Sequence, residues 1–329
     1  MKRILILITL FALTCTLSAQ DLTPKQNSRG KWGYVDSKDN WLVKAKYELG
    51  EEFAPYGFAR VKNKGKWGFV DKTGKEIVKI EYDEVGNFSP DGLVYVKKGD
   101  KWGILDREGK TVAKIKYDEI AEFTAEGTAI ARVGENYGLL SKEGKEIIAV
   151  KYQKVGKFSA DGLAWVKQDD KWGVVSREGK TITKVKYDEE GTFSEDGTAR
   201  VKERGLYGVI NRAGKEILKP EYDLIGEFDA EGLAWSVKGG RYGLVNNMGK
   251  RITDNKYDQV GVFSETGLCL VRADSKWGMI NKAGKEVLKP EYYEIGAFND
   301  MGVAKVMIGG KYGLVDNTGK IIAKIKYDE

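Results

Sequence analysis

The chain of 329 residues is 41% hydrophobic and 32% charged, a composition typical of a soluble, folded protein. It contains no histidine, which excludes Ser-His-Asp and Cys-His catalytic pairs and nearly all histidine-containing metal sites. The formal net charge of +6 is dispersed along the sequence, so we expect no nucleic-acid partner. We expect no cofactor and no metal ion either.

The first nineteen residues are predicted to be a secretory signal peptide. Lys2 and Arg3 precede an apolar run from 4 to 17, and the small residues around Ala19 predict cleavage after it. The apolar run is short for a membrane span, which needs about 20 residues. We therefore expect an exported protein, whether periplasmic, cell-surface or extracellular, with no membrane span after cleavage. Lipid attachment at Cys15 is less favoured, because a threonine precedes it where a glycine, alanine or serine is expected.

The rest of the chain repeats one unit nine times. A Trp-Gly or Tyr-Gly pair recurs every 35 residues without an insertion or a deletion. Two further glycines recur at fixed places in the unit, as at Gly74 and Gly92, and mark turns. We expect a short segment at 20–29 and an array of nine repeats at 30–329, the last one truncated. The aromatic residues of the pairs are Trp32, Trp67, Trp102, Tyr137, Trp172, Tyr207, Tyr242, Trp277 and Tyr312.

The second repeat shows the predicted elements in chain order. Residues 66–70 form a first strand, 71–75 a hairpin turn, and 76–82 a second strand in which apolar and charged residues alternate. Residues 86–92 form another turn, and 93–96 form a third strand. No repeat shows a helical period, so the protein is predicted to be all-β.

These elements resemble the WG-repeat family of bacterial β repeats. The resemblance rests on Lys-Trp-Gly at 66–68, Asp-Lys-Thr-Gly-Lys at 71–75, and Tyr82 and Phe88 at fixed offsets, and it covers residues 30–329. It implies an all-β repeat fold, and it offers no catalytic motif. Four repeats have tyrosine in place of tryptophan, and the first repeat has Asp39 in place of the turn glycine.

A second period of 70 residues lies on top of the first. Position 76 is glutamate in alternate repeats, and position 78 is alternately a large aliphatic residue and a small one. An odd number of strands per repeat would turn adjacent repeats in opposite directions, so the structural unit could be the pair, and large residues could pack against small ones. The alternative is that an already doubled unit was copied.

The count of strands favours an open array. There are nine hairpins of first and second strands and only eight third strands, which leaves no whole number of units for a ring. We expect an open β-solenoid or superhelical arc, with a β-propeller as the alternative.

Three apparent catalytic or metal motifs belong to the repeat itself. Residues 103–111 resemble a phosphate-binding loop, but the spacing is one residue too long and no helix follows. No turn has ligands at the spacing of a calcium loop. Acidic pairs at Asp83, Asp118 and Asp188, each followed by glutamate, recur as part of the unit, whereas an active site should break the pattern. We therefore expect no enzyme.

One column of the third strand is the best candidate for binding. The aromatic residues of the Trp-Gly pairs are expected to be core, and Cys269, the only cysteine left after cleavage, is expected to be buried. Between two columns of small or β-branched residues, however, the side chains vary from repeat to repeat, so this column is predicted to face solvent or a partner. The predicted ligand-binding residues are Arg60, Tyr95, Trp165, Arg200 and Trp235.

The sequence therefore predicts an exported, non-catalytic repeat scaffold that binds another macromolecule. A protein and a cell-envelope polysaccharide both remain possible partners, with a protein favoured by the mixture of arginine, aliphatic and aromatic residues. The alternatives are a carbohydrate-active enzyme on a β scaffold and a purely structural spacer.

Overall fold

The computed structural model describes residues 21–328, and the predicted signal peptide lies outside this range. All regular elements in this range are β-strands, β1 to β32. The same range contains no helix that is long and apolar enough to cross a membrane. The prediction of an all-β protein is confirmed.

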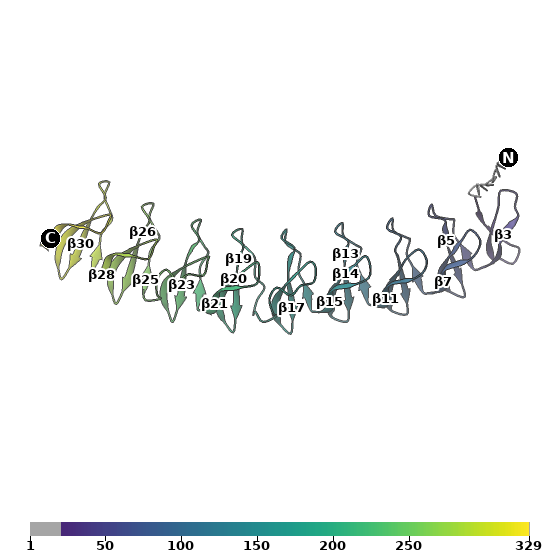
Figure 1. The fold of residues 1–329 in the computed structure, drawn as a ribbon, viewed down its shortest axis with the longest axis horizontal. Coiled ribbons are helices and arrows are strands. Elements are labelled where there is room, and N and C mark those ends of the chain that lie inside the picture. The colour runs from purple at the N-terminus through teal and green to yellow at the C-terminus, as the bar shows by residue number, and fades with distance from the viewer. Residues whose placement is uncertain (1–20, 329) are drawn as a thin grey trace, which may run out of the picture. The chain divides into compact units, whose positions relative to one another are not determined.

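The strands form nine small antiparallel sheets, and the chain divides into two compact units after Val150. Figure 1 shows that the sheets of each unit follow one another in chain order. Unit 1 contains sheet A (β1 Thr23–Gln26, β2 Trp32–Val35, β3 Trp41–Tyr47), sheet B (β4 Leu49–Gly50, β5 Phe58–Asn63, β6 Lys66–Asp71, β7 Glu76–Tyr82), sheet C (β8 Glu84–Val85, β9 Val94–Lys98, β10 Lys101–Leu105, β11 Thr111–Tyr117) and sheet D (β12 Glu119–Ile120, β13 Thr128–Val133, β14 Asn136–Ser141, β15 Glu146–Tyr152).

Unit 2 contains five sheets, E to I, built in the same way. They are sheet E (β16 Lys154–Val155, β17 Leu163–Gln168, β18 Lys171–Ser176), sheet F (β19 Thr198–Glu203, β20 Leu206–Asn211, β21 Glu216–Tyr222), sheet G (β22 Leu224–Ile225, β23 Leu233–Lys238, β24 Arg241–Asn246), sheet H (β25 Gln259–Val260, β26 Leu268–Ala273, β27 Lys276–Asn281, β28 Glu286–Tyr292) and sheet I (β29 Glu294–Ile295, β30 Val303–Ile308, β31 Lys311–Asp316, β32 Ile321–Tyr327).

The sheet boundaries differ from those predicted. The third strand pairs with the Trp-Gly strand that follows it, as β9 pairs with β10 through Lys98 and Lys101, because a two-residue turn with Gly99 at φ +61° joins them. A short fourth strand that the sequence did not predict, such as β8, pairs with the other side of β9. In sheet A, β1 takes the place of the missing third strand and pairs with β2.

The glycine of the Trp-Gly pair faces a bulge in the next strand. Opposite Gly68, the register of β6 and β7 shifts between Trp67 and Phe69. A Cβ on Gly68 would lie 2.6 Å from the carbonyl oxygen of Val78, so no side chain fits there. The bulge also places Tyr82 opposite Trp67.

The tyrosines at the end of the second strand, not the aromatic residues of the Trp-Gly pairs, are the fully buried column. Trp67 and its counterparts are only half-buried, so the prediction that they are fully buried core residues is wrong. The amino groups of lysines lie over some of their rings, as Lys97 does over Trp102 at 5.4 Å from the ring centroid. The members of this column that are at most 6% exposed are Tyr47, Tyr82, Tyr117, Tyr152, Tyr187, Tyr222, Tyr257 and Tyr292, while Tyr327 in the last strand is 52% exposed.

Within each unit, most neighbouring repeats share one backbone contact. A Cβ on the turn residue Gly109 would lie 2.1 Å from the carbonyl oxygen of Ile77 in the repeat before it. Gly144 has the same relation to Val112. This contact recurs from one repeat to the next within each unit, also at Gly214, Gly249, Gly284 and Gly319. The single repeat is therefore the structural unit, and the possibility that adjacent repeats alternate in direction is not realised.

The 70-residue period is instead expressed in the polar contacts between repeats. Glu146 in sheet D accepts hydrogen bonds from Lys116 Nζ at 2.7 Å and Tyr117 Oη at 3.0 Å in sheet C. The same arrangement joins sheets E and F through Glu216, and sheets G and H through Glu286. Three of the four alternate glutamates form this cluster, whereas at Glu76 the hydroxyl of Tyr47 has no hydrogen-bond partner within residues 21–328.

Each hydrophobic core is formed mainly between two consecutive sheets. In one such core, Met279 and Leu288 of sheet H pack with Ala304 and Val306 of sheet I. Cys269 is buried at 1% exposure, as predicted. Each sheet ends in edge strands that do not pair with each other, so the sheets are open. The prediction of an open tandem-repeat fold is confirmed.

Candidate functional site

The variable column of the third strand lies beside the next repeat. We use this name for residues 60, 95, 130, 165, 200, 235, 270 and 305. Tyr95 donates a hydrogen bond from its hydroxyl to the carbonyl oxygen of Ala121 at 3.1 Å, and its ring lies 6.5 Å from that of Phe123. Burial raises the pKa of the Tyr95 hydroxyl. At Tyr95 the column therefore contacts the following repeat, and the side chain is half-buried.

Trp165 is buried, and the prediction that it is exposed is wrong. Its side chain is 8% exposed and belongs to a core that includes Tyr187. A Cβ on Gly191 of the next repeat would lie 2.5 Å from the indole ring. The ring of Phe193, which belongs to the same repeat as Gly191, lies 6.1 Å from the indole ring between centroids. A buried tryptophan with this packing stabilises the fold and offers little surface to a partner.

Trp235 is half-buried and lies at the edge of a groove. Its ring stacks on that of Phe263, with centroids 5.8 Å apart and planes at 7°. Gly261 and Val262 line the same groove, and Val262 is 90% exposed. A stacked pair with an accessible edge is a rigid apolar surface that a partner can bind.

The two arginines of the predicted set are held by glutamates. Arg60 donates to both carboxylate oxygens of Glu51, at 2.8 and 2.7 Å, and to the carbonyl oxygen of Val85 at 3.3 Å. Arg200 donates to the carbonyl oxygen of Ile225 at 3.0 Å and pairs with Glu227. Together, these ion pairs and hydrogen bonds hold each guanidinium against the following repeat. The binding role of all five residues stays a prediction.

Three consecutive grooves in unit 2 have column residues in their lining. The F–G groove contains Arg200 and has a volume of about 440 Å³. The G–H groove contains Trp235 and has a volume of about 460 Å³. The H–I groove contains Leu270 and has a volume of about 240 Å³. Each groove is lined on its far side by a phenylalanine from the next repeat, namely Phe228, Phe263 and Phe298.

Two exposed apolar residues of this region are not among the residues predicted from the sequence. Val262 and Met301 are 90% and 82% exposed, and both line pockets near the end of the chain. Most counterparts of Val262 are polar, such as Glu227, and most counterparts of Met301 are acidic, such as Glu231. An apolar residue at a turn position that is polar in most repeats was therefore the sequence signal for these two exposed side chains.

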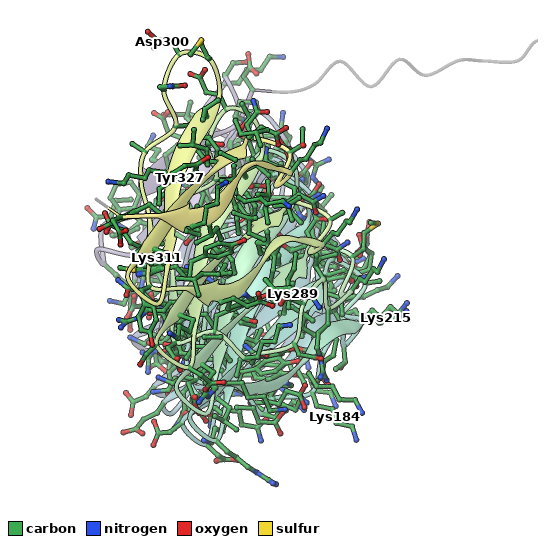
Figure 2. All side chains as sticks on the ribbon, turned by 90° about the vertical axis from the view of Figure 1, so that its left-hand side faces the viewer. Lys184, Lys215, Lys289, Asp300, Lys311 and Tyr327 are labelled. Atoms are coloured by element: carbon green, nitrogen blue, oxygen red, sulfur yellow. The ribbon has the colours of Figure 1, made fainter. Side chains whose placement is uncertain are left out.

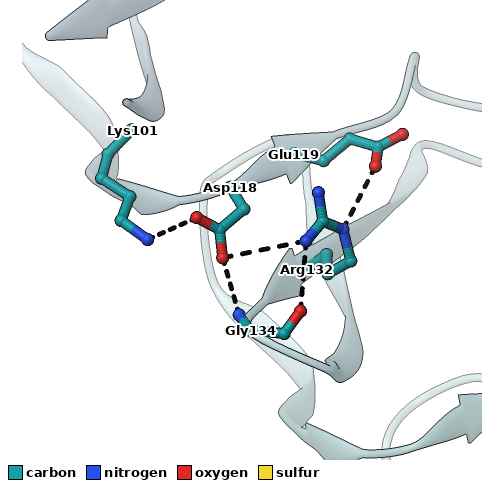
Figure 3. Close-up of polar contacts among 5 residues, drawn as sticks. All are labelled: Lys101, Asp118, Glu119, Arg132 and Gly134. Carbon is teal, nitrogen blue, oxygen red and sulfur yellow. Dashed lines mark hydrogen bonds and ion pairs between the residues drawn. The ribbon is translucent and has the colours of Figure 1, made fainter. Parts of the chain in front are cut away.

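The recurring acidic pairs anchor hairpin turns. Asp118 accepts a hydrogen bond from the backbone N–H of Gly134 at 2.6 Å and pairs with Lys101, and Arg132 joins it to Glu119, as Figure 3 shows. The hydrogen bond from Lys101 is the largest of the contacts that lower the pKa of Asp118. The prediction of a turn role is confirmed at this pair.

One repeat has a buried serine at a third-strand position that is valine or alanine in the other repeats. Ser236 in sheet G is fully buried, donates to the carbonyl oxygen of Gly243 at 3.3 Å and accepts from Asn255 Nδ2 at 3.2 Å. These contacts satisfy the serine and contain no base that could activate it. Residues 21–328 also hold no group of three or more metal-ligating His, Cys, Asp or Glu side chains.

The family described as "WG containing repeat" matches nine consecutive segments that span residues 32–329. The chain belongs to the WG-repeat family. The resemblance predicted from the sequence is therefore confirmed. No curated protein matches the chain.

Solved structures show distant similarity to this WG-repeat chain. The extracellular domain of a putative hybrid two-component system from B. thetaiotaomicron has 12% identity and a TM-score of 0.40, over 89% of this chain and 48% of the other. The WG-repeat chain thus spans about half the length of that structure. A eukaryotic initiation factor has 10% identity and a TM-score of 0.30, over 94% and 98% of the two chains.

A third similar structure is PorZ, a surface component of the type-IX secretion system of Porphyromonas gingivalis. It has 11% identity and a TM-score of 0.23, over 76% of this chain and 39% of PorZ. TM-scores at this level carry no argument about function.

Proposed function

We propose that the protein is an exported, non-catalytic scaffold that binds an extended polypeptide in the F–G, G–H and H–I grooves. The main support for the proposal is that one lining residue differs from groove to groove while the residue opposite it does not. The column residue changes from Arg200 to Trp235 to Leu270, while the opposing phenylalanine stays the same. A constant frame with variable contacts is typical of repeat proteins that bind partners.

The spacing of the grooves suits an extended peptide. Sheets that pack face to face lie about 10 Å apart, and an extended chain rises about 3.3 Å per residue. Neighbouring grooves would therefore take side chains about three residues apart. The G–H and H–I grooves select apolar side chains through Trp235 and Leu270, while the F–G groove is polar and contains Arg200 with Glu227.

A polypeptide fits this set better than an uncharged glycan. Glycan binding uses exposed aromatic faces, and of these three grooves one contains a tryptophan, whose ring already stacks on Phe263. Mixed charged, aromatic and aliphatic contacts are the composition of protein interfaces. The cell-envelope polysaccharide is therefore the second candidate for these grooves.

Export is part of the proposal. It rests on the basic start at Lys2 and Arg3, the apolar run from 4 to 17 and the small residues before the predicted cleavage after Ala19. Mass spectrometry of the protein from its host tests it. We expect a chain that begins at residue 20 and is recovered from the cell envelope or the medium. A chain that keeps residue 2 and stays in the cytoplasm would contradict export.

The binding proposal is tested with a displayed library of random linear peptides. The chain from residue 20 onward is used for selection, and the affinities of selected peptides are then measured against the parent and Trp235→Ala. We expect roughly tenfold weaker binding for the variant, as for a tryptophan at a binding hot spot. Met248→Ala removes a 79% exposed side chain that lines none of the three grooves and is the matched control.

Equal affinities for the parent and Trp235→Ala would reject the grooves as the site. A failure to select any peptide above background would favour the alternative of a structural spacer. Turnover of a glycan by the parent chain would favour the enzyme alternative.

A further inference from the structure

Two exposed lysines recur in most repeats, one directly after the turn glycine and one four residues later, in the second strand. We call these fifteen residues the lysine row. Each is exposed, and none of them forms an ion pair or a side-chain hydrogen bond within residues 21–328. They are Lys44, Lys75, Lys79, Lys110, Lys114 and Lys145 in unit 1, and Lys180, Lys184, Lys215, Lys219, Lys250, Lys285, Lys289, Lys320 and Lys324 in unit 2.

Within each repeat, basic and acidic residues are concentrated in different parts, although the charges look dispersed along the sequence. The nine segments that hold the turn and the second strand, such as 176–187, contain 29 basic and 16 acidic residues. The rest of the described range contains 24 basic and 32 acidic residues. The lysine row therefore belongs to a part of each repeat with excess positive charge, while the remainder is acidic.

Packing between repeats places the lysines of one repeat beside those of the next. A Cβ on Gly214, which precedes Lys215, would lie 2.2 Å from the carbonyl oxygen of Ile182, two residues before Lys184. Figure 2 shows Lys184 and Lys215 at the right-hand edge, Lys289 nearer the middle, and Lys311 on the left. Lys311 belongs to the other kind of lysine, which is paired with an aspartate, here Asp328.

We propose that the lysine row binds a linear acidic polysaccharide along each unit. The row presents a pair of positive charges in six repeats and a single one in the other three, and the repeats follow at about 10 Å, the spacing of packed sheets. Such a spacing suits a polymer whose negative charges are separated by whole sugar units. This surface is separate from the three grooves and its partner differs from theirs.

The same observations disfavour the two other polyanionic partners. DNA carries one charge per about 1.7 Å of duplex, far denser than the row, and single strands need exposed aromatic side chains for stacking. A membrane surface needs apolar anchors. In the seven inner turn-and-strand segments, between residues 71 and 292, the large apolar side chain that is exposed is Met248, so apolar anchors do not accompany the row there. Further large apolar side chains that are exposed in these segments, all of which lie within residues 21–328, occur only in the first and the last, at Trp41, Leu42, Ile321, Ile322 and Tyr327.

The experiment measures fluorescence anisotropy of labelled hyaluronan and polygalacturonate with the chain from residue 20 onward. The row variant carries Lys184→Ser, Lys215→Ser and Lys289→Ser. The control variant carries Lys64→Asn, Lys157→Ser and Arg204→Asn, which removes three exposed, unpaired charges outside the row. Asparagine suits positions 64 and 204 because both have positive φ. Thermal melts verify that both variants are folded.

We expect the parent to bind at least one of the two polysaccharides, more weakly at about 150 mM salt than at about 20 mM. The row variant should bind roughly tenfold more weakly, because contacts that neutralise the polymer are lost, and the control variant should bind as the parent does. Neutral dextran should not bind. Trp235→Ala should leave this binding unchanged, which separates it from the function of the grooves.

Four results would overturn the proposal. They are no binding of either polysaccharide by the parent, equal losses in the row and control variants, equal or tighter binding of single-stranded DNA, and equal or tighter binding of vesicles rich in anionic lipid.

Discussion

The indole ring of Trp235 lies parallel to the phenyl ring of Phe263 in the next repeat, with centroids 5.8 Å apart and planes at 7°. At the same place one pair of repeats earlier, Trp165 packs on Phe193 with the planes at 30° and is 8% exposed. Two tryptophans at equivalent positions thus have different surroundings. One is part of a core, and the other lines a groove.

The two tryptophans should therefore differ in their contribution to stability. Trp165→Ala removes a buried ring and should lower the free energy of unfolding by about 3–5 kcal/mol. Trp235→Ala should cost clearly less, because the ring is half-buried. Chemical denaturation of the parent and both variants measures the difference. Equal losses for the two variants would contradict the assignment of Trp165 to the core.

The glycine of the Trp-Gly pair should be irreplaceable. A Cβ on Gly173 would lie 2.9 Å from the carbonyl oxygen of Lys184 and 3.0 Å from the backbone of Val185. Gly173→Val should cost several kcal/mol of stability because backbone must move to make room. Gly205→Asn is the control, since its φ of +81° suits asparagine and nothing lies within 4 Å. Equal melting temperatures for Gly173→Val and the parent would show that the close approach is unimportant.

The interface between sheets C and D should lose stability in acid. Burial alone would raise the pKa of Glu146, but hydrogen bonds from Lys116 and Tyr117 outweigh it, so the pKa lies below the ordinary value of 4.5. A carboxyl group with a lowered pKa in the folded state stabilises the fold above its unfolded pKa. That contribution should decline as the pH falls below 4.5.

Glu146→Gln should flatten this acid dependence. The measurement is the denaturation midpoint as a function of pH for the parent, the variant and Glu265→Gln, which changes an exposed loop carboxylate. Glu265→Gln should follow the parent. An identical pH profile for Glu146→Gln and the parent would show that the cluster contributes nothing to the pH dependence.

The thiol of Cys269 should react only when the array opens. The side chain is 1% exposed, and burial raises the pKa of the thiol to about 11. At pH 8 the folded chain should therefore resist a thiol reagent, and the thiol should react at once in denaturant. The rate of labelling below the denaturation midpoint then reports opening of sheet H. Fast labelling of the native chain would contradict burial.

The sequence predicted strands well and their partners less well. The turn at 71–75 and the alternation after it predicted the second strand at 76–82, which is where β7 lies. The pairing of the third strand with the Trp-Gly strand that follows it was not predicted, because pairing is decided by the turn that joins two strands. The turn before Lys101, with Gly99 at positive φ, was the local signal for the correct hairpin.

The candidate site was predicted in part. The variation at positions 200 and 235 pointed to residues that line grooves. It also pointed to Trp165, because variation in a column reports a change of surroundings and does not distinguish core from surface. The fourth strand, such as Glu84–Val85, is too short to produce a periodic pattern in the sequence. The loop that follows this strand lines the groove, so the groove could not be predicted while the strand was missing from the prediction.

The measurement that tests the central claim most directly is the affinity of library-selected peptides for the parent and for Trp235→Ala. The parent should bind peptides that share apolar residues about three positions apart, and the variant should bind them roughly tenfold more weakly, as expected at a hot spot. Binding that is unchanged in Trp235→Ala but lost in Met248→Ala would place the partner elsewhere and contradict the grooves as the binding site.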